Sequence, residues 1–186
     1  RAVQQLAFLS AEHEVTLLSH VDGAEPAAAR AAVLALGVRV DTVPLSPMGS
    51  WARAWLGLLA REPSQVAFYR SSHMRELVAR HVHEGNYDAI WVQLFRVAQS
   101  LDGVEHPAKV LFLADSIALN LGRAQAFEPW WKRPVIAWES RRVAACEVAA
   151  TKSFREAWVV SPVDRDDLQS RGVPHARLVP HGVDEA

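Results

Sequence analysis

The stretch "AKVLFLADS", residues 108–116, combines an almost continuous apolar run with two polar residues, Asp115 and Ser116, at its end. Two further stretches have the same apolar character, "YDAIWVQLF" at 87–95 and "EAWVVSP" at 156–162. Strands that are buried on both faces have this composition, and they belong to parallel sheets covered by helices. The three stretches therefore predict the interior strands of such a sheet.

Strand and helix patterns alternate along the rest of the chain. Further strands are predicted at 13–19, which ends before His20, at 38–45 and at the last apolar run, Leu178-Val179-Pro180. Helical patterns span residues 2–11, 25–37, 48–61, 64–85 and about 131–153. This alternation is typical of an α/β, Rossmann-like, doubly wound domain, in which helices cover both faces of a mostly parallel sheet. The 186 residues fit one such domain.

Composition excludes several classes of function. The net charge is -1, whereas binding to nucleic-acid phosphates requires a clustered excess of Lys and Arg. Cys146 is the single cysteine, so no internal disulfide can form and a reducing compartment is expected. No stretch approaches the roughly 18 consecutive apolar residues of a membrane span, and the first residues lack the pattern of a signal peptide. We therefore expect a cytoplasmic globular domain.

Polar residues at the carboxyl ends of the predicted strands are the candidate site, because ligands of doubly wound domains bind there. These residues are His20, Gln93, Arg96, Asp115, Ser116 and Ser161. A carboxylate such as Asp115 can accept a hydroxyl proton, and a guanidinium such as Arg96 can bind a phosphate or carboxylate. Each also has a structural alternative. Asp115 can cap the next helix, Arg96 can form a surface ion pair, and His20 can be a structural histidine.

Six stretches, taken in order, resemble the N-terminal half of GT-B glycosyltransferases of family 4, and among these the bacterial enzymes that build exopolysaccharide. They are "HEVTLLSHVD", "YDAIWVQ", "KVLFLADS", "ESRRVAACE", "AWVVSPVDRDDL" and "LVPHGVDEA". The resemblance covers nearly the whole chain. It implies the acceptor-binding domain of a retaining transferase, which moves a sugar from a nucleotide-sugar to a hydroxyl group on a glycan or lipid-linked acceptor.

The resemblance also implies missing parts. The family's first strand and its Gly-rich loop have no counterpart in this sequence. Residues 180–186 resemble the start of the interdomain hinge, in which His181 stands where the family has Asn. The domain that binds the nucleotide-sugar would follow this hinge, so the chain alone is expected to be inactive. No metal or other cofactor is implied, because helix dipoles and basic residues of the second domain neutralise the leaving diphosphate.

Within this family, the position of Asp115 is where the enzymes often place a polar residue that orients or deprotonates the acceptor hydroxyl group. The resemblance therefore implies a catalytic role for Asp115. The remaining residues at the strand ends are then expected to line or border the acceptor pocket, namely Ser116, Gln93, Arg96, His20 and Ser161.

Three acidic or histidine pairs have structural explanations. Asp164-x-Asp166 resembles a metal-binding motif, but Ser161 and Pro162 predict a helix start with Asp164 in a capping box. Glu139 and Glu147 have the spacing of a donor-domain signature, but here they predict a solvated, ion-paired helix face. His81 and His83 cannot share one helix face. No metal site is predicted, and Cys146 is expected to be a buried small hydrophobe.

Seven tryptophans are a high number for this length. Trp51 and Trp55 lie four residues apart on a predicted amphipathic helix, and Trp130-Trp131-Lys132-Arg133 forms a second aromatic and basic cluster. Helices of this kind can lie at a membrane interface, which would bring the domain to the inner face of the membrane. An aromatic stripe at this spacing is also typical of a helix face buried in the core.

Two other functions stay open. A Rossmann-like module that binds a ligand or partner without catalysis would explain the lack of a convincing catalytic set, and tight nucleotide binding by this chain alone would favour it. Another GT-B-type enzyme, such as a nucleotide-sugar epimerase, is the second alternative. Binding of an acceptor alone would favour the transferase.

Overall fold

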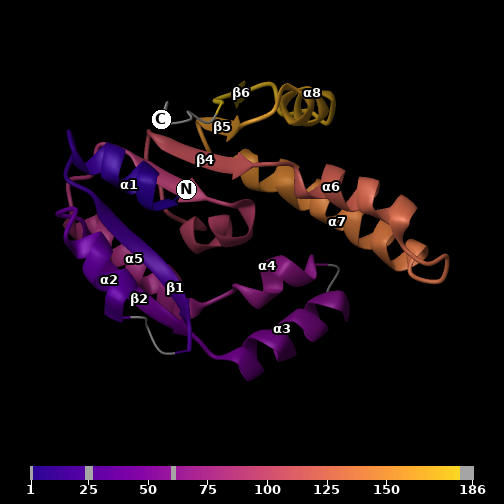
Figure 1. Cartoon of the computed structure of the whole chain (residues 1–186), viewed down its shortest axis with the longest axis horizontal. Helices are drawn as coiled ribbons and strands as arrows, with labels where there is room; N and C mark the ends of the chain where they lie inside the picture. Colours follow the sequence, from indigo (N-terminus) through magenta and orange to yellow (C-terminus); the bar gives the residue numbers. More distant parts are fainter. Residues whose placement is uncertain (1, 24–26, 60–61, 181–186) are drawn as a thin grey trace.

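The computed structural model describes residues 2–23, 27–59 and 62–180. Every strand in this part of the chain is parallel to its neighbours, and the strands form two sheets. The smaller sheet pairs β1 (Thr16–Asp22) with β2 (Arg39–Leu45). The larger sheet has the order β3 (Ile90–Gln93), β4 (Lys109–Ala114), β5 (Glu156–Val159) and β6 (Ala176–Leu178). The predicted α/β class with parallel strands is confirmed (Figure 1).

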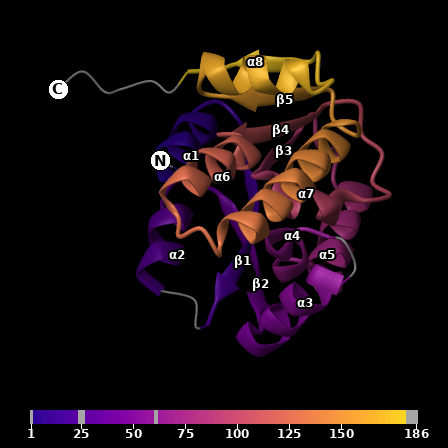
Figure 2. The same cartoon turned by 90° about the vertical axis from the view of Figure 1, so that its right-hand side faces the viewer.

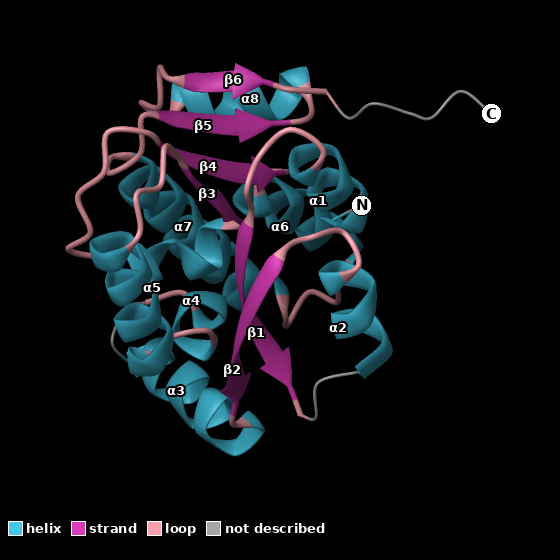
Figure 3. Cartoon of the chain, turned by 90° about the vertical axis from the view of Figure 1, so that its left-hand side faces the viewer, coloured by secondary structure: helices cyan, strands magenta, loops and turns pink. Residues whose placement is uncertain are grey.

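Helices connect the strands and lie on both sides of them (Figure 3). The α-helices are α1 (Ala2–Ser10), α2 (Ala27–Leu34), α3 (Pro47–Leu59), α4 (Ser64–Phe68), α5 (Ser72–Glu84), α6 (Ile117–Ala124), α7 (Arg133–Thr151) and α8 (Pro162–Ser170). Two 3-10 helices, η1 (Phe95–Leu101) and η2 (Gln125–Phe127), follow β3 and α6. The sequence predicted most of these elements to within a few residues.

The predicted helix 64–85 is wrong, because the structure has two helices there. α4 ends at Phe68, and the hydroxyl of Ser71 accepts a hydrogen bond from the amide of Met74 at 3.2 Å, so that α5 begins with its own N-cap. A Ser that can cap a helix favours a new start over continuation, because it satisfies an amide that has no partner within the helix.

The hydrophobic core is centred on the larger sheet. Leu111 in β4, and Ala157 and Val159 in β5, have no exposed surface. Val143 of α7 and Leu168 of α8 are equally buried against them. In contrast, β1 has no fully buried residue. The larger sheet and the helices that pack on it therefore contain most of the hydrophobic core.

Among the described residues, no strand pairs with the outer edge of β1 or with the outer edge of β3. The expected single sheet is thus replaced by two, and helices such as α5, which contacts both β1 and η1, join them. In this part of the chain, no helix is both long enough and apolar enough to cross a membrane.

Candidate functional site

The carboxyl edge of the larger sheet carries unusual backbone. Leu94, directly after β3, has a φ of 77°, and Ala114, the last residue of β4, has a φ of 62°. Such left-handed conformations are uncommon outside glycine and cost roughly 1–3 kcal/mol each. The ladder between β4 and β5 also shifts register between Phe112 and Ala114. Strain of this kind concentrates at functional sites. It occurs at the ends of the neighbouring strands β3 and β4, so the carboxyl edge of the larger sheet is a candidate site.

Asp115 follows this strained turn and is exposed. Its amide donates to the carbonyl of Leu113 at 2.9 Å, which closes a tight turn at the end of β4. Ser116, and not Asp115, is the N-cap of α6, because the Ser116 hydroxyl accepts from the amide of Leu119 at 3.2 Å. The capping alternative for Asp115 is therefore wrong, and its carboxylate is accessible at the edge of the sheet.

Ser116 has no exposed surface and belongs to a buried polar network. Its hydroxyl donates to the Glu147 carboxylate at 3.2 Å, and its amide donates to Asp164 at 3.2 Å. The Arg171 guanidinium donates to Ser116 and to Glu147 at 2.9 Å each. Ser116 therefore faces the interior behind the edge, where it joins the starts of α6 and α8 to α7.

Glu147 is the centre of this network and is fully buried. The predicted solvated face is thus wrong for Glu147. One of its oxygens accepts from the Ile117 amide at 2.7 Å and from the Ala118 amide at 3.3 Å, at the positive end of α6. Burial raises the pKa of Glu147 above its ordinary value of 4.5, while the charge and hydrogen bond of Arg171 oppose that shift.

Glu139 is also largely buried and accepts from the amide and hydroxyl of Ser64 at 2.8 and 2.7 Å. It is therefore not on a solvated face either, although its predicted ion pair with Arg142 is present at 3.4 Å. The burial of both carboxylates was not predicted, because most of their hydrogen-bond partners lie far away in the sequence.

A second group of residues lies around Arg96, which follows β3, and around His20, which lies inside β1 and not after it as predicted. The ring of His20 lies 6.1 Å from that of Tyr69, and the Arg96 guanidinium carbon lies 5.6 Å from the centre of the same Tyr69 ring. Arg53 of α3 is close enough for its charge to affect His20. We call His20, Arg53, Tyr69 and Arg96 the cationic cluster.

Several polar atoms of the cationic cluster lack hydrogen-bond partners and countercharges. Both ring nitrogens of His20, and the Nε atoms of Arg53 and Arg96, are inaccessible to solvent and have no hydrogen-bond partner among the described residues. Neither arginine forms an ion pair with a described carboxylate, and the one side-chain bond of Arg53 goes to the Ser50 hydroxyl at 2.9 Å. Burial lowers the pKa of His20, and the charge of Arg53 reinforces that shift. An anionic ligand would supply the missing countercharge.

The two remaining predicted site residues lie at the same edge. Gln93 is the last residue of β3 and is exposed. Ser161 caps α8, and its hydroxyl accepts from the Val163 amide at 3.2 Å, as predicted. The predicted capping box does not form, because the Asp164 carboxylate accepts from Ser116 instead. No group of three or more His, Cys, Asp or Glu in the described part of the chain is arranged to hold a metal ion.

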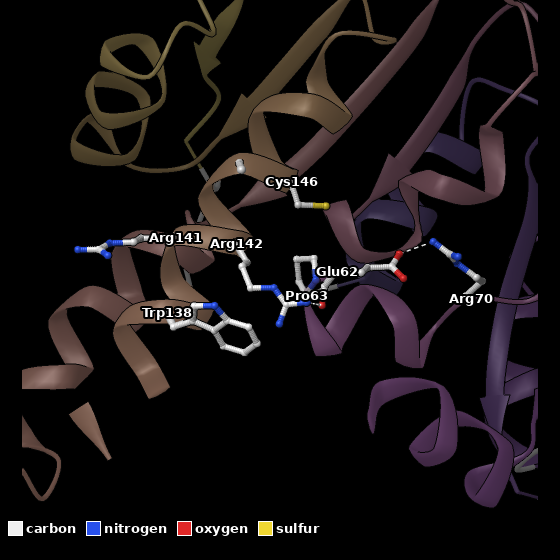
Figure 4. Close-up of a pocket in the computed structure, with 8 residues that line it drawn as sticks. Glu62, Pro63, Arg70, Trp138, Arg141, Arg142 and Cys146 are labelled. Carbon is white, nitrogen blue, oxygen red and sulfur yellow. Dashed lines mark hydrogen bonds and ion pairs between the residues drawn. The ribbon is translucent and has the colours of Figure 1, made fainter. Parts of the chain in front are cut away.

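A cavity of about 620 Å³ lies between α7 and the connection from α3 to α4 (Figure 4). Its polar lining is mostly basic and includes Arg70, Arg141 and Arg142. The Arg142 guanidinium stacks over Trp138 at 4.1 Å and donates to the carbonyls of Gly57 and Glu62. The half-buried Cys146 lines the same cavity, and burial raises its pKa to about 11.

Sequence reasoning missed Tyr69 and Arg53 as members of the site. Tyr69 lies in the break between α4 and α5, which was predicted to be continuous helix. Arg53 was grouped with the tryptophans of its own helix. Only a tertiary arrangement could place either residue beside His20.

Comparisons with models of known protein families, with curated proteins and with solved structures gave no match.

Proposed function

We propose that this chain is the acceptor-binding half of a retaining GT-B glycosyltransferase, which moves a sugar from a nucleotide-sugar to a hydroxyl group of a glycan or lipid-linked acceptor. The observation that carries the proposal is the convergence of functional groups at one edge of the fold. An accessible carboxylate, Asp115, follows β4, and Arg96, which belongs to a positive cluster without countercharge, follows the neighbouring strand β3.

Asp115 has the chemistry of a group that orients or deprotonates an acceptor hydroxyl. Its carboxylate is exposed after a backbone turn that costs free energy to hold, and a positioned carboxylate can accept a proton as the transfer proceeds. The cationic cluster is suited to the anionic part of an acceptor, such as a phosphate or carboxylate. In this proposal a second domain binds the nucleotide-sugar, and the enzyme acts in the cytoplasm.

The test compares kcat and the acceptor KM of variants of a protein that joins this chain to a donor-binding domain. Asp115→Ala is expected to lower kcat about 100-fold or more, with little change in Tm, since general-base catalysis contributes roughly that factor. Arg96→Ala is expected to raise the acceptor KM with a smaller effect on kcat, because it removes binding charge. Asp88→Ala, an exposed aspartate before β3, serves as the matched control.

Three results would count against the proposal. Turnover by residues 1–186 alone would show that no second domain is needed. An Asp115→Ala protein with unchanged specific activity but reduced folded yield would assign Asp115 to structure. Tight binding of a nucleoside diphosphate by residues 1–186, without acceptor binding, would favour a ligand-binding module instead.

A further inference from the structure

The cavity lined by Trp138 and Cys146 lies apart from the site proposed for sugar transfer. No residue predicted at the strand ends lines it, and no member of the cationic cluster does. Its volume of about 620 Å³ falls in the range of roughly 300–1,000 Å³ that is typical of small-molecule sites. α7 supplies most of the lining and runs beside α4 in Figure 2, where hydrogen bonds between Glu139 and Ser64 join the two helices.

The apolar part of the lining consists of Trp138, Pro63, Ala145 and Cys146. Trp138 is 43% exposed, so part of its indole ring is accessible to a ligand. Burial raises the pKa of the Cys146 thiol to about 11, and the neutral thiol therefore adds no negative charge to the cavity. An indole beside small apolar groups suits a flat, apolar body.

Arg142 holds the two sides of the cavity together. Its side chain is only 9% exposed, and its guanidinium carbon lies 4.1 Å from the centre of the Trp138 ring. The same guanidinium donates to the carbonyl of Gly57 at 2.6 Å and to that of Glu62. The wall around Trp138 is thus fixed before any ligand arrives, which lowers the free-energy cost of binding.

The charged part of the lining has an excess of positive charge. It contains Arg70, Arg141, Arg142 and the carboxylate of Glu62, and Glu139 pairs with Arg142 from outside the lining. Three cations and two anions give a net charge of +1. A single negative charge on a ligand would therefore balance the cavity.

Two of these arginines have unused donors. Arg70 donates through Nε to Gln99 at 3.1 Å and through Nη2 to Glu62, whereas its Nη1 has no partner among the described residues. Arg141 is exposed at the rim, has no partner in the described part of the chain, and points away from Cys146 in Figure 4. Arg70 is therefore the group best placed to bind a carboxylate inside the cavity.

We propose that this cavity is a binding site for an aromatic carboxylate, with its ring against Trp138 and its carboxylate at Arg70. The apolar wall selects a ring over a small inorganic anion, and the charge of +1 selects a monoanion over a neutral ring. The site does not depend on the proposed sugar transfer, because it shares no residue with the groups proposed for that reaction.

The test is calorimetric titration of residues 1–186 with 1-naphthoate. Saturable binding to one site is expected, at least about tenfold tighter than that of the neutral 1-naphthalenemethanol, because the charged hydrogen bond is lost. Acetate, which has the charge without the ring, should bind at least about tenfold more weakly than 1-naphthoate. Bound 1-naphthoate should also slow the reaction of Cys146, the single cysteine, with N-ethylmaleimide.

Variants locate the bound ring. Trp138→Ala is expected to weaken binding about tenfold or more, because it removes the aromatic wall. Ala145→Phe fills the cavity without deleting a contact and should weaken binding at least as much. Ala149→Phe, an exposed position one turn further along α7, is its matched control and should bind as the unchanged chain does.

Trp55→Ala controls for exposed tryptophan. Trp51 and Trp55 are 62% and 69% exposed, so the alternative that they form a core stripe is wrong. Trp55 does not line the cavity, and its removal should leave binding unchanged.

Absence of saturable binding would overturn the proposal, as would equal affinity for the neutral analogue. Unchanged binding by Ala145→Phe would place the ring outside the cavity and would also overturn it. Equal losses in Trp55→Ala or Ala149→Phe would assign the binding to the exposed surface instead. Thermal unfolding identifies variants that are folded, and Ala145→Phe keeps the test decisive if Trp138→Ala is not.

Discussion

Glu147 illustrates what a single buried charge does in this chain. Its carboxylate joins three helices, because it accepts from the first amides of α6 and from Arg171 after α8. Taking a carboxylate out of water costs several kcal/mol, and only good partners offset this cost. The sequence predicted local features such as the Ser161 cap, since they depend on neighbouring residues. It failed for Glu147, whose partners lie 24 to 31 residues away.

Glu147→Gln is expected to change the free energy of unfolding by no more than about 1 kcal/mol at about pH 4, because the amide and the protonated carboxyl are both neutral groups that form hydrogen bonds. The pKa of Glu147 is raised in the folded state, so its protonation favours folding. This contribution is complete below the unfolded pKa and is lost as the pH rises through the folded pKa. The original chain should therefore lose stability relative to Glu147→Gln as the pH rises above about 4.5, the ordinary pKa of this group.

Urea unfolding at a series of pH values measures this difference. Glu76→Gln, an exposed change on α5, serves as the control and should change stability little. A gain in stability of the original chain over Glu147→Gln as the pH rises would mean that Arg171 outweighs burial and that the folded pKa is lowered.

At the scale of helices and strands, contacts between helices determine features that the sequence patterns did not predict. The pattern of residues 48–61 predicted α3 correctly, but it did not say which face of α3 is covered. α4 covers one side, and Trp51 and Trp55 remain mostly exposed. Similarly, the break at Tyr69 is visible only once Ser71 is recognised as a cap, and that break places Tyr69 in the cationic cluster.

Two helical glycines test this packing in opposite directions. A Cβ on Gly57 would lie 2.7 Å from the Cβ of Ala67, whereas a Cβ on Gly122 would have no atom nearer than the Ser140 hydroxyl at 3.9 Å. Replacing Gly by Ala within a helix gains up to about 1 kcal/mol. Overpacking costs roughly 1–3 kcal/mol. Gly57→Ala should therefore destabilise the chain, and Gly122→Ala should stabilise it slightly.

Midpoints of urea unfolding compare the two variants directly, since each is the other's control for helix propensity. Stabilisation by both substitutions would show that α3 and α4 can separate without cost. That result would contradict the close approach of α3 to α4.

At the scale of the whole molecule, the sequence predicted the class of fold but not its division into two sheets. Strand patterns show which residues are extended and how deeply each strand is buried. They do not show whether two strands are neighbours, because pairing is settled by long-range contacts. The continuous apolar runs of β4 and β5 correctly indicated the interior of the larger sheet. The mixed pattern predicted a strand at 13–19, whereas the half-buried β1 runs three residues later, from Thr16 to Asp22.

The two sheets should open separately. β1 and β2 hydrogen-bond only to each other among the described strands, and no residue of β1 is fully buried. β4 lies between β3 and β5, and Leu111 to Leu113 are at most 3% exposed. Local opening free energies follow burial and pairing. In native-state hydrogen exchange, the amides of residues 17–20 should therefore exchange at least about tenfold faster than those of residues 111–113.

Equal protection in both sheets would mean that α5 and its neighbours join them into one cooperative unit. In that case the cationic cluster, which spans β1, α3 and η1, would be a rigid site. With separate opening, an anion at His20 and Arg96 would join the two sheets and slow exchange in β1. Inorganic phosphate added to the same experiment measures that effect, and Arg96→Ala should abolish it.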